Sequence, residues 1–238
     1  MLTKKSSENP VEQLNESRIQ PVSRRKFLGY IGAGSAILAT TAVVSSCKKD
    51  DPAPNNSGVD LGSGDVGVLN YAYALEQLEA AFYLRVTSSF YSGITATEQA
   101  YLTDIRDHEV AHRNFFKAAI SGAGATPIVD LEVDFSSIDF GNRTSVLGAA
   151  KAFEDLGVTA YNGAGKLIVT PAYLVVAGQI VSVEARHAAA IADLISNGTF
   201  ADTTDANGLD TARTPAQVLA IADTYIVTQI NASNLPTS

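Results

Sequence analysis

The stretch Asp107-His108-Glu109-Val110-Ala111-His112-Arg113 decides the fold of this 238-residue chain. It contains a Glu109-x-x-His112 pair, and the same pattern returns downstream as Glu184-x-x-His187. The chain has three histidines, so two of the three fall on this pattern. Residues three apart share one face of a helix. Each pair is therefore expected to direct a carboxylate and an imidazole toward one point.

A glutamate followed seven residues later by a tyrosine precedes each of these patterns. The first such pair is Glu76 with Tyr83, and the second is Glu154 with Tyr161. Seven residues make two helical turns, so the two side chains of each pair also share a face. The spacing from the leading glutamate to the Glu-x-x-His pattern is 33 residues in the first half and 30 in the second. The chain therefore presents one arrangement of side chains twice.

This order of residues is the ligand set of a two-metal carboxylate site inside a four-helix bundle. The sequence resembles the ferritin-like superfamily and, more narrowly, the exported bacterial ferritin-like-domain family. The motifs that carry the resemblance are Leu75–Tyr83, Ala160–Ala164 and Val183–Ala189, and the resemblance covers roughly residues 65–197. It implies an all-α fold, a ferritin-like four-helix bundle.

Capping residues and apolar spacing predict the individual helices. The first has Asp65 as its expected N-cap, the second opens on a capping box at Thr95–Glu98, and a proline marks the first turn of the fourth. The fourth helix is apolar nearly all round in its first half, which predicts a central place in the bundle. The predicted helices run from Asp65 or Val66 to Ser89, Thr95 to Gly122, Thr144 to Gly163 or Lys166, and Thr170 to Asn197.

The inner face of the second helix is expected to carry Tyr101, Ile105, Glu109, His112 and Phe116, which follow one another at three-to-four spacing. His108 lies about 100° around the helix from Glu109. It is therefore expected at the surface or next to the ligands, and not as a ligand itself.

Residues 122–142 are too long for a tight turn between antiparallel helices. A helix of about 25 residues is about 37 Å long, and about 20 extended residues cover that distance. A long crossover between the second and third helices is therefore predicted, with the third parallel to the second. Residues 198–238 form a polar loop and a short fifth helix, which Thr214-Pro215 starts and which continues to about Gln229.

The resemblance assigns metal-binding roles to six side chains. Glu76 and Glu154 would be terminal ligands, Glu109 and Glu184 would be shared by two metals, and His112 and His187 would each supply one imidazole. Carboxylates combined with imidazoles suit two iron or manganese ions.

Two points about this site stay open in the sequence. Glu79 lies three residues from Glu76 on nearly the same face and competes with it as the ligand, although the repeated spacing favours Glu76. Tyr83 and Tyr161 either orient carboxylates and handle an electron, or simply pack in the core.

The N-terminal region reads as an export signal. Residues 1–46 hold Ser23-Arg24-Arg25-Lys26-Phe27-Leu28 before a short apolar run, which resembles a twin-arginine signal, with a retained signal anchor as the alternative. Cys47 ends a lipobox-like motif and is the expected lipid attachment site, the alternative being an ordinary buried thiol. Residues 47–64 would form a flexible tether. The expected location is the periplasmic side or the cell surface of a Gram-negative bacterium.

The composition excludes some classes of partner and of metal site. A net charge of −8 repels phosphate backbones, so nucleic acid is not an expected partner. A single cysteine excludes an internal disulfide and a cysteine-rich metal site. Three interpretations compete: a two-metal oxidoreductase that oxidises Fe(II) or reduces oxygen or peroxide, a metal-binding protein without turnover, and a structural module whose carboxylates are ion-paired. Assembly as a homodimer stays open.

Overall fold

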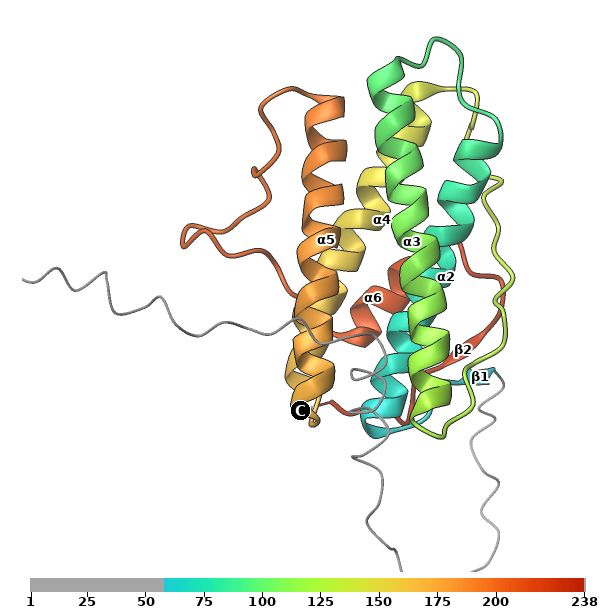
Figure 1. Cartoon of the computed structure of the whole chain (residues 1–238), viewed down its shortest axis with the longest axis vertical. Coiled ribbons are helices and arrows are strands. Elements are labelled where there is room, and N and C mark those ends of the chain that lie inside the picture. Colours follow the sequence, from blue (N-terminus) through green and yellow to red (C-terminus); the bar gives the residue numbers. More distant parts are fainter. Residues whose placement is uncertain (1–57, 238) are drawn as a thin grey trace, which may run out of the picture.

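The computed structural model describes residues 58–237, so the predicted signal, Cys47 and most of the predicted tether lie outside the described residues. Four long helices stand side by side and form a bundle (Figure 1). This confirms the all-α, four-helix prediction. The elements are β1 (Val59–Asp60), α2 (Gly64–Ser88), α3 (Ala96–Gly122), α4 (Arg143–Ala164), the 3-10 turn η2 (Gly165–Leu167), α5 (Pro171–Ile195), α6 (Pro215–Ala222) and β2 (Ile230–Asn231).

The helices are connected as the sequence predicts. Helices α2 and α3 are antiparallel neighbours, and so are α4 and α5 (Figure 1). Between these pairs, the segment after α3 runs back along the whole bundle before α4 begins (Figure 1). Helix α4 therefore runs in the same direction as α3. The two hairpins, α2–α3 and α4–α5, face each other across the bundle interior.

Two buried amides of α2 hold the crossover against the bundle. The Oδ1 atom of Asn70 accepts a hydrogen bond from the backbone N–H of Ile128 at 3.1 Å, and the Oε1 atom of Gln77 accepts one from Leu131 at 2.8 Å. Both side chains are buried, where a polar group needs a partner. The crossover thus has a fixed path over α2.

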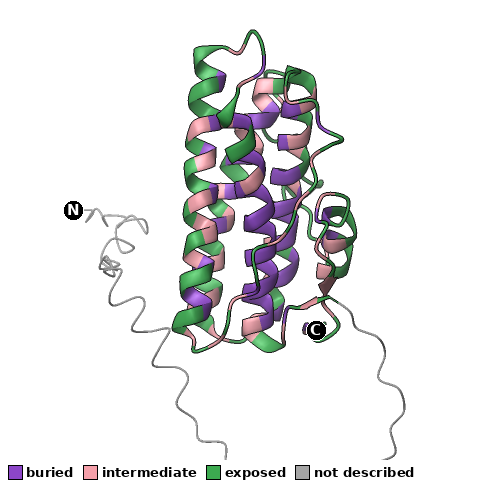
Figure 2. Cartoon of the chain, turned by 90° about the vertical axis from the view of Figure 1, so that its right-hand side faces the viewer, coloured by how far each residue is buried: buried purple, intermediate pink, exposed green. Residues whose placement is uncertain are grey.

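The central helix is α2, so the prediction that places the fourth helix at the centre is wrong. Seventeen of the 25 residues of α2 are buried, against six of the 25 in α5 (Figure 2). The apolar residues Leu174 and Val175 of α5 are 48% and 62% exposed. The reason is that the crossover and the C-terminal segment cover α2, whereas no described segment covers the outer side of α5 at these residues.

Helix α5 is also the one helix among residues 58–237 that is long and apolar enough to cross a membrane. A helix that packs inside a bundle can have the same length and apolar composition as a membrane-spanning helix. Helix α5 packs against α4 and places the buried residues Glu184 and His187 inside the bundle. Within this fold it is a bundle helix.

The predicted capping box of α3 is present: the Oγ1 atom of Thr95 accepts from the N–H of Glu98, and the Glu98 carboxylate accepts from the N–H of Thr95. The predicted N-cap of α2 is wrong. Ser63 occupies that position, and Asp65 instead accepts hydrogen bonds from the N–H groups of Val169 and Thr170, at 2.8 and 2.9 Å. Asp65 therefore ties the start of α2 to the start of α5.

The short C-terminal helix is confirmed, but it ends at Ala222 and not near Gln229. Beyond it the chain pairs with other segments: the N–H of Val227 donates to the carbonyl of Glu132 at 2.8 Å, and β2 pairs in parallel with β1. These backbone groups have partners outside the helix, which ends the helical hydrogen-bonding pattern. No local signal in the sequence marks these distant contacts.

One inner-face assignment on α3 is also wrong. Tyr101 is 43% exposed, and Leu102, one position later, is fully buried in its place. The later members of the predicted face, Ile105, Glu109 and Phe116, are buried as expected. The inner face of α3 therefore begins at Leu102.

Replacing Gly163 by alanine should destabilise the fold. A Cβ atom at Gly163 would lie 1.7 Å from the carbonyl oxygen of Arg213, whose N–H donates to the carbonyl of Thr159. Backbone must move, and overpacking of this kind costs about 1–3 kcal/mol. Urea unfolding measures the loss. The control is Gly148→Ala on the same helix, where a Cβ meets nothing within 4 Å and alanine should be neutral or stabilising. Equal stability of the two variants would contradict the prediction.

Candidate metal centre

Each long helix brings at least one acidic side chain to the same place in the bundle interior. The side chains form two groups of potential ligands, and within each group the ligand atoms lie within 4.8 Å of one another. Glu109 of α3 and Glu184 of α5 belong to both groups. The first group, called the His112 half, is Glu76, Glu109, His112 and Glu184, and the second, called the His187 half, is Glu109, Glu154, Glu184 and His187.

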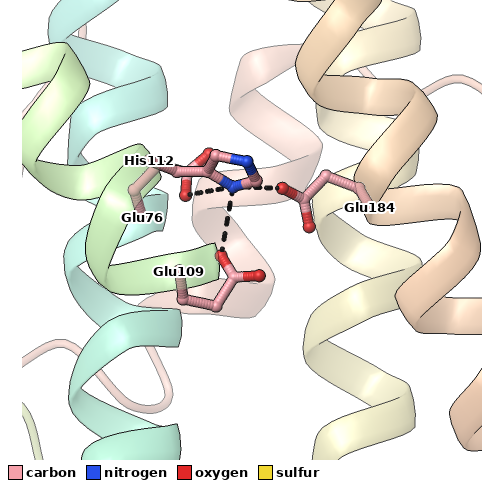
Figure 3. Close-up of side chains that lie close together, drawn as sticks. All are labelled: Glu76, Glu109, His112 and Glu184. Carbon is pink, nitrogen blue, oxygen red and sulfur yellow. Dashed lines mark ion pairs between the residues drawn. The ribbon is translucent and has the colours of Figure 1, made fainter. Parts of the chain in front are cut away.

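In the His112 half, one ring nitrogen faces three carboxylates from three helices (Figure 3). The Nδ1 atom of His112 lies 2.8 Å from Oε1 of Glu184, 3.5 Å from Oε2 of Glu76 and 3.7 Å from Oε2 of Glu109. The imidazole thus occupies the middle of a ring of oxygen donors.

The His187 half repeats this arrangement. The Nδ1 atom of His187 lies 2.9 Å from Oε1 of Glu109 and 3.4 Å from Oε2 of both Glu154 and Glu184. Glu109 thus directs one oxygen toward each histidine, and Glu184 does the same. These two glutamates connect the halves.

The atoms that face the centre are buried, and among the described residues they make only the ion-pair contacts given above and no hydrogen bond. Leaving one such polar atom unsatisfied costs roughly 1–3 kcal/mol, and more for a charged group. A cation coordinated by these atoms would satisfy all of them, so the residues fit a metal site. The atoms are Glu76 Oε2, both carboxylate oxygens of Glu109 and Glu184, Glu154 Oε2, His112 Nδ1 and His187 Nδ1.

Two tyrosines fix the outer carboxylates, each from the opposite hairpin. The hydroxyl of Tyr83 on α2 donates to Oε1 of Glu154 on α4 at 2.5 Å, and the hydroxyl of Tyr161 on α4 donates to Oε1 of Glu76 on α2. Burial raises the pKa of both phenols, so they remain protonated donors. The second oxygen of each glutamate is left facing the centre. Of the two roles open in the sequence, these hydrogen bonds favour orientation of the carboxylates.

Protons balance the negative charge when no metal is bound. Burial opposes the charged form of both imidazoles, but contacts with the surrounding glutamates raise the pKa of His112 and of His187 to about 12. Burial likewise opposes ionisation of Glu109, yet the two histidines lower its pKa. Burial raises the pKa of Glu76 and of Glu154. Metal ions would therefore displace protons from the histidines on binding.

Glu76, and not Glu79, is the residue of α2 whose carboxylate lies in these groups. Glu79 is buried nearby and packs against Gly157 of α4, where a Cβ atom would lie 2.9 Å from Oε1 of Glu79. Gly157 therefore makes room for a fifth buried carboxylate. The sequence offers no signal for this contact, because it joins two helices 78 positions apart in the chain.

Glu79→Gln should stabilise the metal-free protein at pH 8 more than at pH 5. Burial and the neighbouring glutamates raise the pKa of Glu79 above its ordinary value of 4.5. Folding therefore favours the protonated form, and the stability this form contributes is full below pH 4.5 and declines as the pH rises. Glutamine keeps the neutral form at every pH. Urea unfolding of chelator-treated protein at both pH values tests this, with Glu132→Gln at an exposed position as control. An effect independent of pH would contradict it.

Comparison with known proteins agrees with this geometry. A family model described as the ferritin-like domain matches residues 64–197, which contain all four long helices and the six residues of the two groups. A search of curated proteins returned no match. Because the family match covers more than half of the sequence, the chain belongs to the ferritin-like domain family.

Proposed function

We propose that the bundle binds two iron or manganese ions, one in each half of the centre. Each ion would have one outer glutamate, one histidine and the two shared glutamates as ligands. Carboxylate oxygens with an imidazole nitrogen suit these metals. The observation that carries the proposal is the set of buried ligand atoms from four helices that have no hydrogen-bond partner among residues 58–237.

We further propose that the centre works as an oxidoreductase. Two bound Fe(II) ions would supply one electron each, which with two protons is enough to reduce one peroxide molecule to two waters. The chain provides the setting for such chemistry: four carboxylates are buried together, and the hydroxyls of Tyr83 and Tyr161 hold two of them by hydrogen bonds. A buried site whose side chains are held by hydrogen bonds favours reaction in a fixed geometry.

A surface pocket gives small molecules a way to the centre. It is lined by His112 together with Ala111 and Phe115 of α3 and Val176, Gln179 and Ile180 of α5. The imidazole of His112 is thus the point where the buried centre meets solvent between α3 and α5. Oxygen or peroxide would approach from this side.

The experiment that tests the function is elemental analysis of purified protein followed by kinetics of Fe(II) oxidation. We expect about two metal ions per chain and consumption of oxygen or peroxide when Fe(II) is added. Two bound ions without consumption of either oxidant would show a metal-binding protein that lacks turnover. Absence of bound metal after incubation with Fe(II) or Mn(II) would favour the structural module.

We also propose that the protein is exported and held at a membrane by lipid on Cys47. The support is in the sequence: Arg24-Arg25 before an apolar run, and Cys47 where that run ends. Cys47→Ser should move the protein from the membrane fraction to the soluble fraction and abolish labelling with radioactive fatty acid. Membrane retention of this variant would favour an uncleaved signal anchor.

Self-association through α5 is a further part of the proposal. Leu174 and Val175 are exposed apolar residues on this helix, and Val169 just before it is 82% exposed. Burying such residues against a second copy would remove apolar surface from water. Light scattering of the purified protein measures whether its mass is that of one chain or two.

A further inference from the structure

The third histidine of the chain contacts the metal centre from outside. His108 is an exposed residue of α3, one position before Glu109. Its Nδ1 atom lies 2.9 Å from Nε2 of His187 on α5, and the two ring planes differ by 10°. The other nitrogen of His187 faces the carboxylates of the His187 half. Both nitrogens of His187 are therefore engaged, one inward and one outward.

This contact selects one tautomer of His187. A neutral imidazole that binds a metal through Nδ1 carries its proton on Nε2. In this geometry the Nε2–H of His187 donates to Nδ1 of His108, which must be unprotonated there to accept. A hydrogen bond to the second nitrogen of a metal-binding histidine fixes the ring orientation and raises its strength as a ligand.

The His112 half has no equivalent of this contact among residues 58–237. The Nδ1 atom of His112 faces its carboxylates in the same way, but His112 also lines the surface pocket between α3 and α5. In the repeated pattern, the residue before Glu109 is His108 and the residue before Glu184 is Val183. Valine has no side-chain hydrogen-bonding group. The two halves therefore differ at this position even though their ligand sets match.

We propose that His108 is a positioning residue that makes the His187 half the tighter of the two metal positions. This inference rests on the proposed two-metal function. Metal ions would bind in two steps, first in the half where the imidazole is already fixed and then in the half where it is not. The difference between the steps comes from a residue that does not touch metal.

The test is calorimetric titration of the metal-free protein with Co(II), followed also by the visible absorption of the bound ion. Wild-type protein should show two steps. His108→Val, which copies Val183, should weaken the first step by about tenfold to a hundredfold and leave the second unchanged. His108→Gln should restore most of the loss, because its side-chain carbonyl accepts a hydrogen bond. Asp107→Asn, an exposed neighbour on α3, controls for a change of surface charge.

The outcomes separate this inference from the proposed function. Two bound Co(II) ions in wild type, a loss confined to the tight step in His108→Val and its recovery in His108→Gln would support the positioning role. Two bound ions with identical titrations of wild type and His108→Val would overturn the inference and leave the proposed function standing. Equal weakening of both steps would overturn it as well. A wild-type protein that binds no Co(II) would overturn both.

Discussion

Glu109→Gln should remove metal from both halves of the centre, whereas Glu154→Gln should remove it from one. Glu109 directs one oxygen to each half, while Glu154 lies only in the His187 half. Glutamine replaces one of the two oxygens by an NH₂ group, which cannot bind a cation, and it removes a negative charge that both ions would share. We expect metal content to fall from about two ions per chain to nearly none in Glu109→Gln and to about one in Glu154→Gln.

Loss of a residue that only hydrogen-bonds to a metal ligand lowers metal affinity by about tenfold to a hundredfold. Loss of the ligand itself should lower the metal affinity by more than this. Elemental analysis after dialysis gives the metal content, and circular dichroism shows whether the variants fold. Glu132→Gln, which makes the same change at an exposed position, should keep both ions. A Glu109→Gln protein that still held two ions would show that the shared carboxylate is not a ligand.

Saturating metal should raise the melting temperature of the protein by about 15 to 30 °C. Each site filled at about a thousand times its dissociation constant adds about 4 kcal/mol, so the two sites together add about 8 kcal/mol. Each kcal/mol raises the melting temperature of a chain of this size by about 2–4 °C. Mn(II) is the suitable probe because it is not readily oxidised by air. Differential scanning calorimetry of metal-free and Mn(II)-saturated protein measures the shift.

The matched control is the double variant His112→Ala with His187→Ala, in which each half loses its imidazole. Its melting temperature should respond little to Mn(II), because both sites lose a ligand and most of their affinity. Each single variant should retain part of the shift. A shift of equal size in wild type and in the double variant would mean that the metal acts elsewhere on the protein.

The sequence predicts which side chains lie together in the candidate centre because residues at helical spacing lie on the same side of a helix. Once Glu109 and His112 lie on one regular helix, their spacing alone directs both side chains to the same side. Glu76, Glu154, Glu184 and His187 follow the same rule, so a local pattern repeated twice is enough to place them on inner faces. The structure brings all six together.

What the sequence does not predict depends on contacts between distant segments. Helix α5 is apolar nearly all round in its first half. Whether such a helix is central depends on which segments cover it, and the covering segments lie on α2. The fit of Gly157 to Glu79 and of Gly163 to Arg213 also joins distant positions. The His108 imidazole lies off the inner face of α3 but reaches His187 on the neighbouring helix. Whether His108 contacts His187 depends on the distance between α3 and α5. The residue pattern of a single helix does not predict that distance.

The crossed tyrosine–glutamate hydrogen bonds have a consequence for how this centre evolves. Tyr83 of the first hairpin holds Glu154 of the second, and Tyr161 of the second holds Glu76 of the first. Neither hairpin therefore controls the outer carboxylate of its own half alone. Loss of the tyrosine in one hairpin therefore releases a carboxylate of the other, so the two hairpins are constrained to change together.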